Sequence, residues 1–177
     1  MVAGELGGRR LDTPGGDGSR PSTDRVREAV FNALESLDAV AGATVLDAFA
    51  GSGALGIEAL SRGAARAVFA EVAPAALEVV ATNLSTLGLT SRAEVRRGDG
   101  PAAAAAGRWD LVLLDPPYGF DGWPGLLAVV RDRLEPGGVV VVESDREIEV
   151  PDGLMVLRTR RYGGTVVRFL THPGAVA

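Results

Sequence analysis

Residues 45–56 read Val-Leu-Asp-Ala-Phe-Ala-Gly-Ser-Gly-Ala-Leu-Gly, an apolar run that enters a glycine-rich turn before a helical pattern. Glycine lets a backbone approach a ligand closely, and free amides at a helix N-terminus favour an anionic group. Gly51, Gly53 and Gly56 satisfy the G-x-G-x-x-G pattern, and Glu71 follows Gly51 by 20 residues, where it could hold ribose hydroxyls. The stretch predicts a strand-turn-helix unit that binds either NAD or S-adenosylmethionine; a tight turn without a ligand is the alternative.

Asp47 favours one of these cofactors over the other. At the carboxyl end of the expected strand, a carboxylate would repel a pyrophosphate but could accept hydrogen bonds from the ammonium of a methionine moiety. It could also simply cap the loop. Asp99, after the third expected strand, is placed to bond an adenine amino group, unless it is an ordinary turn aspartate. The expected S-adenosylmethionine contacts are Asp47, Phe49, Ala50, Gly51, Ser52, Gly53, Glu71, Gly98 and Asp99.

Outward from this unit, short apolar runs alternate with helical patterns. We expect strands at 44–48, 67–71, 93–97, 111–115 and 139–144, and helices at 54–62, 74–87, 102–106 and 124–133. Such alternation implies a parallel sheet built of right-handed crossovers. Two further strands, 154–162 and 165–171, flank Gly163-Gly164 and predict an antiparallel hairpin. The sequence therefore predicts an α/β fold with a seven-stranded, mostly parallel sheet and an antiparallel C-terminal hairpin, Rossmann-like and typical of class I methyltransferases.

The N-terminal part lacks the alternating apolar pattern of the rest of the chain. Residues 1–20 are rich in glycine and lack apolar periodicity, which indicates a short irregular arm or hairpin. Ser22, Thr23 and Asp24 offer helix caps before apolar residues at helical spacing, so we expect an amphipathic helix over 24–37. The predicted organisation is an arm over 1–20 and one domain over 21–177.

The tetrapeptide Asp115-Pro116-Pro117-Tyr118 follows the apolar run Leu111 to Leu114, at the same sheet edge as the glycine turn. An exocyclic amino group on a base is a poor nucleophile because its lone pair is delocalised into the ring. The Asp115 carboxylate and the Pro116 carbonyl can accept its hydrogens and draw the nitrogen towards tetrahedral geometry. The two prolines stiffen the loop, and Tyr118 can stack on a base lifted from its helix. We therefore predict that Asp115, Pro116, Pro117 and Tyr118 form the catalytic group of an amino methyltransferase.

Composition limits the remaining choices. The chain has 177 residues, enough for one core, and it contains no cysteine, which excludes disulfides and thiolate metal sites. No apolar stretch approaches the roughly 20 residues of a membrane span, so we expect a cytoplasmic protein without a membrane partner. The net charge of -5 argues against non-specific coating of nucleic acid. No metal is needed for the predicted chemistry, and the single histidine, His172, is expected at the surface.

With these residues assembled, the chain resembles the RsmD family, bacterial enzymes that methylate N2 of a guanine in 16S ribosomal RNA. The resemblance spans nearly the full length, and its most specific segment is Arg20-Pro21-Ser22-Thr23-Asp24-Arg25-Val26-Arg27-Glu28. The other matching segments are Ala3-Gly4 with Gly8 to Leu11, Asp47 to Gly56, Glu58 to Ala64, Asp115 to Tyr118, and Arg160 to Gly163.

The resemblance implies that 21–177 is a methyltransferase domain whose cofactor is S-adenosylmethionine and whose partner is 16S ribosomal RNA in a small ribosomal subunit. It implies that the arm faces RNA and that the protein acts as a monomer. The residues expected to contact RNA are Arg9, Arg10, Arg20, Arg25, Arg161 and Tyr162. The arm also carries Glu5, Asp12 and Asp17, which offset part of its positive charge.

Other functions share parts of this pattern. The tetrapeptide also suits methylation of adenine N6 in DNA or of glutamine in a protein. A cofactor-binding or RNA-binding module without catalysis would use Asp115 only to cap a turn. An NAD-dependent oxidoreductase could share the glycine turn, but Asp47 and the absence of a recognisable hydride-transfer acid or base disfavour it.

Overall fold

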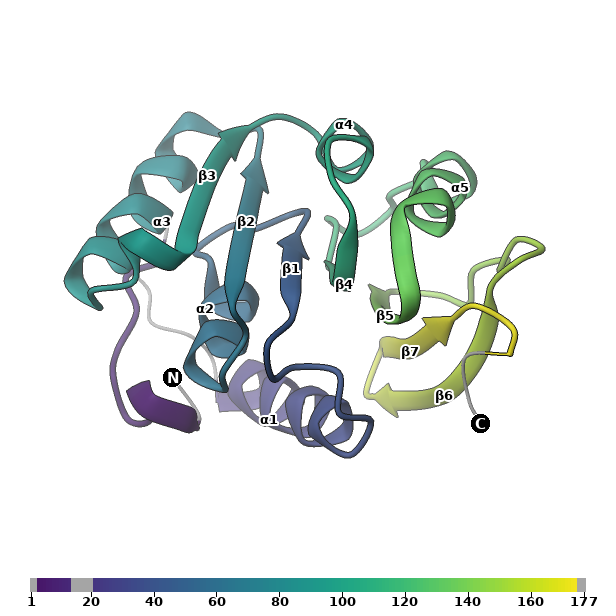
Figure 1. Ribbon diagram of the computed structural model, residues 1–177, viewed down its shortest axis with the longest axis horizontal. Helices are drawn as coiled ribbons and strands as arrows, with labels where there is room; N and C mark the ends of the chain where they lie inside the picture. Colours follow the sequence, from purple (N-terminus) through teal and green to yellow (C-terminus); the bar gives the residue numbers. More distant parts are fainter. Residues whose placement is uncertain (1–2, 14–20, 175–177) are drawn as a thin grey trace.

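The computed structural model of the chain describes residues 3–13 and 21–174. Their seven strands form one sheet in the order β3-β2-β1-β4-β5-β7-β6 (Figure 1). The strands are β1 (Thr44–Asp47), β2 (Arg66–Glu71), β3 (Ala93–Arg97), β4 (Trp109–Leu114), β5 (Leu134–Ser144), β6 (Met155–Tyr162) and β7 (Thr165–Thr171). Strands β1 to β5 run parallel, whereas β7 is antiparallel to both β5 and β6. The predicted α/β fold with a C-terminal hairpin is confirmed.

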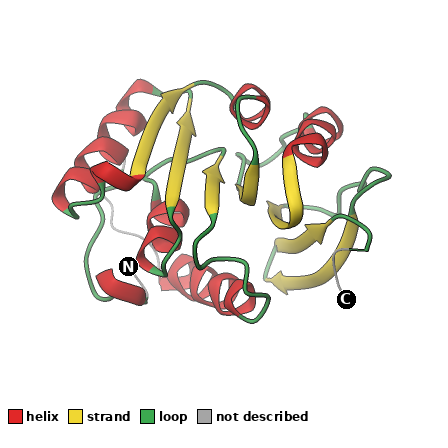
Figure 2. Ribbon diagram, viewed as in Figure 1, coloured by secondary structure: helices red, strands yellow, loops and turns green. Residues whose placement is uncertain are grey.

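Helices cover both faces of the sheet (Figure 2). They are α1 (Pro21–Glu35), α2 (Ala54–Ser61), α3 (Pro74–Thr86), α4 (Gly100–Ala105) and α5 (Trp123–Arg133), with short 3-10 turns η1 (Gly4–Leu6) and η2 (Thr90–Arg92). Apolar residues of α1, α2 and α3 form one buried cluster with Val45, Leu113 and Val141. Those of α4 and α5 form a second cluster with Leu114 and Val142. Strand residues alternate between the two cores because neighbouring side chains point to opposite faces.

The strand order reverses beside β1. The chain moves outward from β1 to β2 and β3, and then returns to place β4 on the other side of β1. Loops that leave β1 and β4 therefore diverge, and they open a crevice at the carboxyl ends of these strands. Open parallel sheets bind ligands at such a point.

Strand β5 is longer than the sequence predicted. It begins at Leu134 rather than Val139, because Leu134 pairs with Trp109 before the register shifts and Leu111 pairs with Val139. The intervening Gly137 has a φ of +80°. The segment Pro136-Gly137-Gly138, which precedes the predicted strand, lies within β5, where the register with β4 shifts.

Two helices also begin earlier than predicted. Helix α1 spans Pro21–Glu35 instead of 24–37, so it starts at a proline, which suits the first turn of a helix. Helix α4 begins at Gly100 rather than Ala102, because the Asp99 side chain accepts a hydrogen bond from the Ala102 amide and caps the helix. This short helix is not purely a surface element, since Ala103 and Ala104 are buried.

The described part of the N-terminal arm, residues 3–13, packs against the domain. The Ala3 amide donates to Glu58 Oε1 at 3.0 Å, and the Leu6 amide donates to Ser61 Oγ at 3.0 Å. Gly4, with a φ of +77°, lies so close to Ser61 that a Cβ there would be 2.0 Å from the Ser61 carbonyl oxygen. Farther along, Asn83 exchanges two hydrogen bonds with the backbone of Asp12. The arm is therefore attached at both ends of its described segment.

No helix within residues 3–13 and 21–174 is long and apolar enough to cross a membrane.

Candidate functional site

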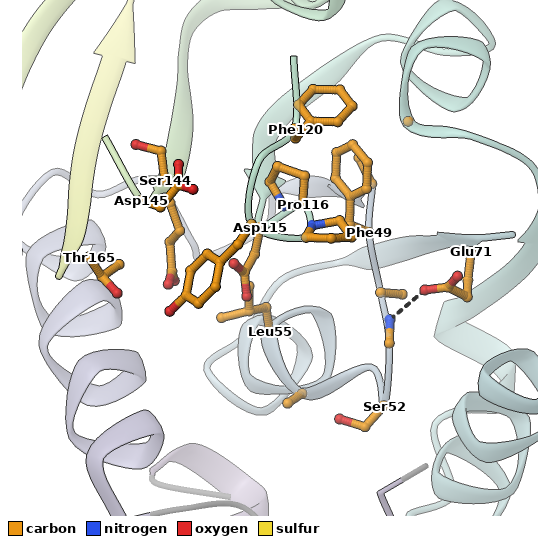
Figure 3. Close-up of a pocket in the computed structure, with 18 of the residues that line it drawn as sticks. Phe49, Ser52, Leu55, Glu71, Asp115, Pro116, Phe120, Ser144, Asp145 and Thr165 are labelled. Carbon is orange, nitrogen blue, oxygen red and sulfur yellow. Dashed lines mark hydrogen bonds between the residues drawn. The ribbon is translucent and has the colours of Figure 1, made fainter. Parts of the chain in front are cut away.

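A cavity of about 850 Å³ lies at the carboxyl ends of the parallel strands. Its wall combines the loops that follow β1, β2, β3, β4 and β5 with α1 and the turn of the C-terminal hairpin. Figure 3 shows Asp115 projecting between Glu71 on one side and Thr165 on the other. Three acidic residues that the sequence placed after separate strands, Glu71, Asp99 and Asp115, thus line one cavity. Its volume lies within the range of small-molecule and cofactor sites.

A hydrogen bond to Asp47 stabilises the glycine turn after β1. This residue is only 1% exposed, and its Oδ2 accepts a hydrogen bond from the Gly56 amide at 2.9 Å. Gly51 and Gly53 adopt positive φ values of +54° and +81°, which favour glycine. Asp47 and Gly53 do not form part of the cavity wall, whereas Phe49, Ala50, Gly51 and Ser52 do. In this structure Asp47 therefore acts as the cap of the loop, the alternative that the sequence left open.

Glu71 ends β2 and lines the cavity beside the glycine turn. Its Oε2 accepts a hydrogen bond from the Gly51 amide at 3.0 Å (Figure 3), and its Oε1 accepts from the amides of Val72 and Ala73. Three backbone amides thus fix the orientation of this carboxylate. Each oxygen can accept more than one hydrogen bond, so the fixed carboxylate can also receive a pair of hydroxyl groups.

Aromatic rings and the turn after β3 complete this end of the cavity. Phe49 packs edge-on against Phe120, with ring centroids 5.4 Å apart, and Phe120 packs likewise against Trp123. A Cβ on Gly100 would lie 2.7 Å from the Phe49 ring, so glycine is required for the ring to sit there. Gly98 and Asp99, two of the residues expected to contact the cofactor, line the cavity, and Asp99 also caps α4 through one oxygen.

These features fit S-adenosylmethionine. The oriented Glu71 carboxylate suits ribose hydroxyls, the apolar Phe49 wall suits an adenine ring, and the glycine backbone admits close approach of a ligand. At Gly51, a Cβ would meet nothing within 4 Å, which leaves the space in front of this turn open.

The tetrapeptide Asp115 to Tyr118 leaves β4 and forms another part of the wall. Pro116 is buried, whereas Tyr118 is 81% exposed. The loop is braced from the segment after β5: the Gly119 amide donates to Asp145 Oδ2 at 3.0 Å. Arg146 donates to the Phe120 carbonyl oxygen at 3.0 Å and forms an ion pair with Asp121 at 2.7 Å. No sequence motif singles out Asp145 and Arg146, because their role depends on contacts across the fold.

Glu143 and Arg27 are two cavity residues that sequence reasoning missed. Glu143 lies near the end of β5, and Arg27 projects from α1. Arg27 is 4% exposed, forms an ion pair with Asp24 at 2.7 Å, and has its Nε 3.8 Å from Glu58 Oε2. A lone glutamate after a Val-rich run carries no distinctive sequence signal, and Arg27 is one of several arginines in the segment Arg20 to Glu28.

Three carboxylates at the ends of adjacent strands have raised pKa values. Burial raises the pKa of Asp47 to about 7, and the charges of Asp115 and Glu71 act in the same direction. Asp115 is open to the cavity but surrounded by protein on its other sides, and this desolvation raises its pKa to about 6. Burial, Asp115 and Asp47 raise the pKa of Glu143 to about 8, against the opposing effect of Arg27. Such a concentration of perturbed groups in a cleft is typical of functional sites.

The residues expected to contact RNA lie on different elements of the fold. Tyr162 lines it, next to Thr165 of the hairpin, whereas Arg161 is exposed and forms an ion pair with Glu147. Arg9 and Arg10 are exposed on the arm, and Arg25 is exposed on α1. Arg20 lies outside the described residues. Among the described members of this set, only Tyr162 contributes directly to the cavity wall.

Comparison with known proteins identifies the group to which this chain belongs. The family model described as "Conserved hypothetical protein 95" matches residues 1–171. Bacillus subtilis YlbH is 40% identical over 94% of this chain and 95% of its own length. Ribosomal RNA small subunit methyltransferase D of Escherichia coli strain K12 is 38% identical over 85% of this chain and 77% of its own length.

The solved structure of Escherichia coli YhhF superposes with a TM-score of 0.86 at 34% identity, over 97% of this chain and 96% of that chain. The match of sequence model, relatives and fold runs through both the glycine turn and the tetrapeptide. The chain belongs to the "Conserved hypothetical protein 95" family, that of the RsmD methyltransferases.

Proposed function

We propose that this protein transfers a methyl group from S-adenosylmethionine to the exocyclic N2 of a guanine in 16S ribosomal RNA of the small subunit. The observation that carries this proposal is that the Asp115 to Tyr118 loop and the Glu71-braced glycine turn line the same cavity. The relatives named for methylation of small-subunit ribosomal RNA support the choice of substrate.

In the proposed arrangement, the two ends of the cavity have different tasks. Glu71 receives the ribose hydroxyls, Phe49 packs on the adenine, and the Gly51 region holds the amino acid part of the cofactor. Asp99 keeps one carboxylate oxygen for the adenine amino group while the other caps α4. When bound, S-adenosylmethionine supplies an electrophilic methyl group on a positively charged sulfur.

The residues of the tetrapeptide orient the amino group. The Asp115 carboxylate and the Pro116 carbonyl oxygen each accept one hydrogen of N2, and so aim its lone pair at the methyl carbon. Most of the rate acceleration then comes from proximity and orientation, because no strong base is needed before transfer. Asp115 or water takes the proton afterwards. Tyr118, which is almost fully exposed, stacks on the base as it enters.

Methyl transfer to ribosomes tests this proposal. Small subunits from a strain without the modification would be incubated with the protein and S-adenosylmethionine labelled in the methyl group, and the RNA would then be digested to nucleosides. We expect the label in N2-methylguanine. Label found only in N6-methyladenine, or only in protein, would overturn the assignment in favour of one of the other amino methyltransferases.

Asp115→Ala tests the role of the tetrapeptide in the same assay. We expect transfer to fall roughly a hundredfold or more, because one of the two acceptors that orient N2 is lost. Binding of S-adenosylmethionine, measured by calorimetry, should persist. Asp132→Ala, which removes an exposed carboxylate paired with Arg131, is the matched control. Full activity of Asp115→Ala would refute the proposed role.

A further inference from the structure

Glu143 stands directly beside Asp115 at the ends of two hydrogen-bonded strands. In the parallel register of β4 and β5, Leu114 pairs with Val142, so the next residues along the two strands are Asp115 and Glu143. Neighbouring strands lie about 4.8 Å apart. Both residues line the cavity. The site therefore presents two carboxylates side by side, although orienting one amino group requires only the first.

The two carboxylates also share a face of the sheet. Leu113 and Val141, two residues before them, belong to the core under α1, α2 and α3. Side chains two residues apart on a strand point the same way, so Asp115 and Glu143 are directed to this face. Arg27 of α1 lies there as well and opposes the rise in the Glu143 pKa.

Arg27 adds a positive charge to the cavity, and its Nη2 forms an ion pair with Asp24 at 2.7 Å. It lines the cavity, is almost fully buried, and its Nε has no hydrogen-bond partner among the described residues. Its contact with Glu58 at 3.8 Å is too long for a hydrogen bond. A buried positive charge favours the ionised form of a nearby carboxylate, here Glu143.

The acidic cluster is not a metal site by its geometry. Within residues 3–13 and 21–174, no group of three or more acidic, histidine or cysteine side chains could hold a metal ion. An acceptor pair in a base-binding cavity instead suits a ligand edge that carries several N–H donors.

The Watson–Crick edge of guanine is such an edge. N2 carries two hydrogens, and the adjacent N1 carries one. Asp115 and the Pro116 carbonyl oxygen take the N2 hydrogens in the proposed function, which leaves N1–H without an acceptor. We propose that Glu143 accepts the hydrogen bond from guanine N1–H and thereby selects guanine as the base that is methylated. This inference rests on the proposed function, because it assigns the base specificity of the same site.

The chemistry of the other bases explains the selection. Adenine N1 and cytosine N3 carry no hydrogen to donate, so neither can stabilise the Glu143 carboxylate, whereas a hydrogen bond from guanine N1–H favours its ionised form. Both bases also carry an exocyclic amino group that Asp115 and Pro116 could orient. Asp115 alone would therefore accept the exocyclic amino group of several bases. Glu143 distinguishes these bases by whether the ring nitrogen beside the amino group carries a hydrogen. A site built to bond a donor rejects analogues that lack it, because its buried acceptor stays unpaired.

Glu143→Gln with a base analogue tests the proposal. The analogue 2-aminopurine keeps the 2-amino group but has an unprotonated N1, which accepts a hydrogen bond instead of donating one. A synthetic RNA with guanine or 2-aminopurine at the methylated position would be ligated into 16S RNA and assembled with the small-subunit proteins. Equal amounts of the two particles compete for enzyme and labelled cofactor, and mass spectrometry of the nucleosides gives the transfer ratio.

We expect the wild-type protein to prefer guanine strongly. In Glu143→Gln, whose amide can donate to N1 of 2-aminopurine, the guanine preference should fall roughly tenfold to a hundredfold. 2-Aminopurine also lacks O6, but this loss affects the wild-type protein and the variant equally. The comparison of two side chains with two bases therefore isolates the contact between position 143 and N1. Glu149→Gln, the same change at an exposed position outside the cavity wall, should keep the wild-type ratio.

Each possible outcome has a definite meaning. An unchanged ratio in Glu143→Gln, whether total transfer is kept or reduced, would overturn the role of Glu143 in selecting guanine. Calorimetry of S-adenosylmethionine binding verifies that the variant is folded. If the wild-type protein places no label on N2 of guanine, the proposed function itself fails, and the inference fails with it.

Discussion

At the scale of single residues, the site is built from carboxylates held where ionisation is unfavourable. Asp47, Asp115 and Glu143 lie at or next to the carboxyl ends of three adjacent strands, and desolvation by the surrounding protein is the first cause of the raised pKa of each. A folded protein with such groups binds more protons than its unfolded chain between the ordinary and the raised pKa values. Their contribution to stability therefore decreases as the pH rises through this interval.

Glu143→Gln should reveal this contribution directly. The pKa of Glu143 rises from an ordinary 4.5 to about 8, with Asp47, Asp115 and Arg27 as the charged groups that face it. Glutamine has no charge to desolvate, so the variant should match the wild-type protein near pH 4.5 and exceed its stability at pH 8. We expect a gain of roughly 1 kcal/mol after solvent screening, or about 2–4 °C in Tm.

Thermal unfolding of both proteins from pH 4.5 to pH 8 measures the difference. Glu149→Gln, at an exposed position, should give a difference that stays near zero across the range. A Glu143→Gln difference that is independent of pH, or that decreases as the pH rises, would contradict the buried, unfavourable ionisation of Glu143.

At the scale of elements, the unit from β1 to α2 shows how packing restricts the glycine turn. The Gly56 amide donates to Asp47, and a Cβ at this residue would lie 2.4 Å from the fully buried Phe69 ring. Gly56 is thus needed for close packing of α2 on β2 rather than for an unusual backbone conformation. This is the packing role of the third glycine in a G-x-G-x-x-G turn.

Gly56→Ala should therefore destabilise the protein. Overpacking a core typically costs about 1–3 kcal/mol, which corresponds to a decrease in Tm of roughly 2–10 °C. Gly125→Ala is the matched control, because it is also on a helix but a Cβ there meets nothing within 4 Å. The control should be neutral or slightly stabilising. Equal Tm values for the two variants would show that the close contact with Phe69 can relax freely.

Most elements could be predicted because their signals are local. Alternating apolar runs placed every strand, and the Gly163-Gly164 pair placed the hairpin. The start of β5 could not be predicted, because the pairing of Leu134 with Trp109 depends on a bulge that only the neighbouring strand reveals. The same contrast applies to the site. Glu71 and Asp115 could be predicted because they belong to local sequence motifs, whereas Glu143, Arg27 and Asp145 acquire their roles from residues distant in the sequence.

At the scale of the whole molecule, the arm and the domain are linked close to the cofactor end of the cavity. Asn83 of α3 is buried, and its amide donates both to the Asp12 carbonyl oxygen of the arm and to the Ser52 carbonyl oxygen of the glycine turn. The hairpin closes the opposite side with Tyr162 and Thr165. Exposed arginines lie on the arm, on α1 and on the hairpin, although the net charge of the chain is -5.

The central claim is that one cavity holds the cofactor beside Glu71 and the target amino group beside Asp115. A crystal structure with S-adenosylhomocysteine and an RNA fragment that contains the methylated guanine tests it most directly. We predict ribose hydroxyls on Glu71, guanine N2 between the Asp115 carboxylate and the Pro116 carbonyl oxygen, and guanine N1 within hydrogen-bond distance of Glu143. A cofactor bound away from Glu71, or a guanine whose N2 contacts neither Asp115 nor Pro116, would contradict the account.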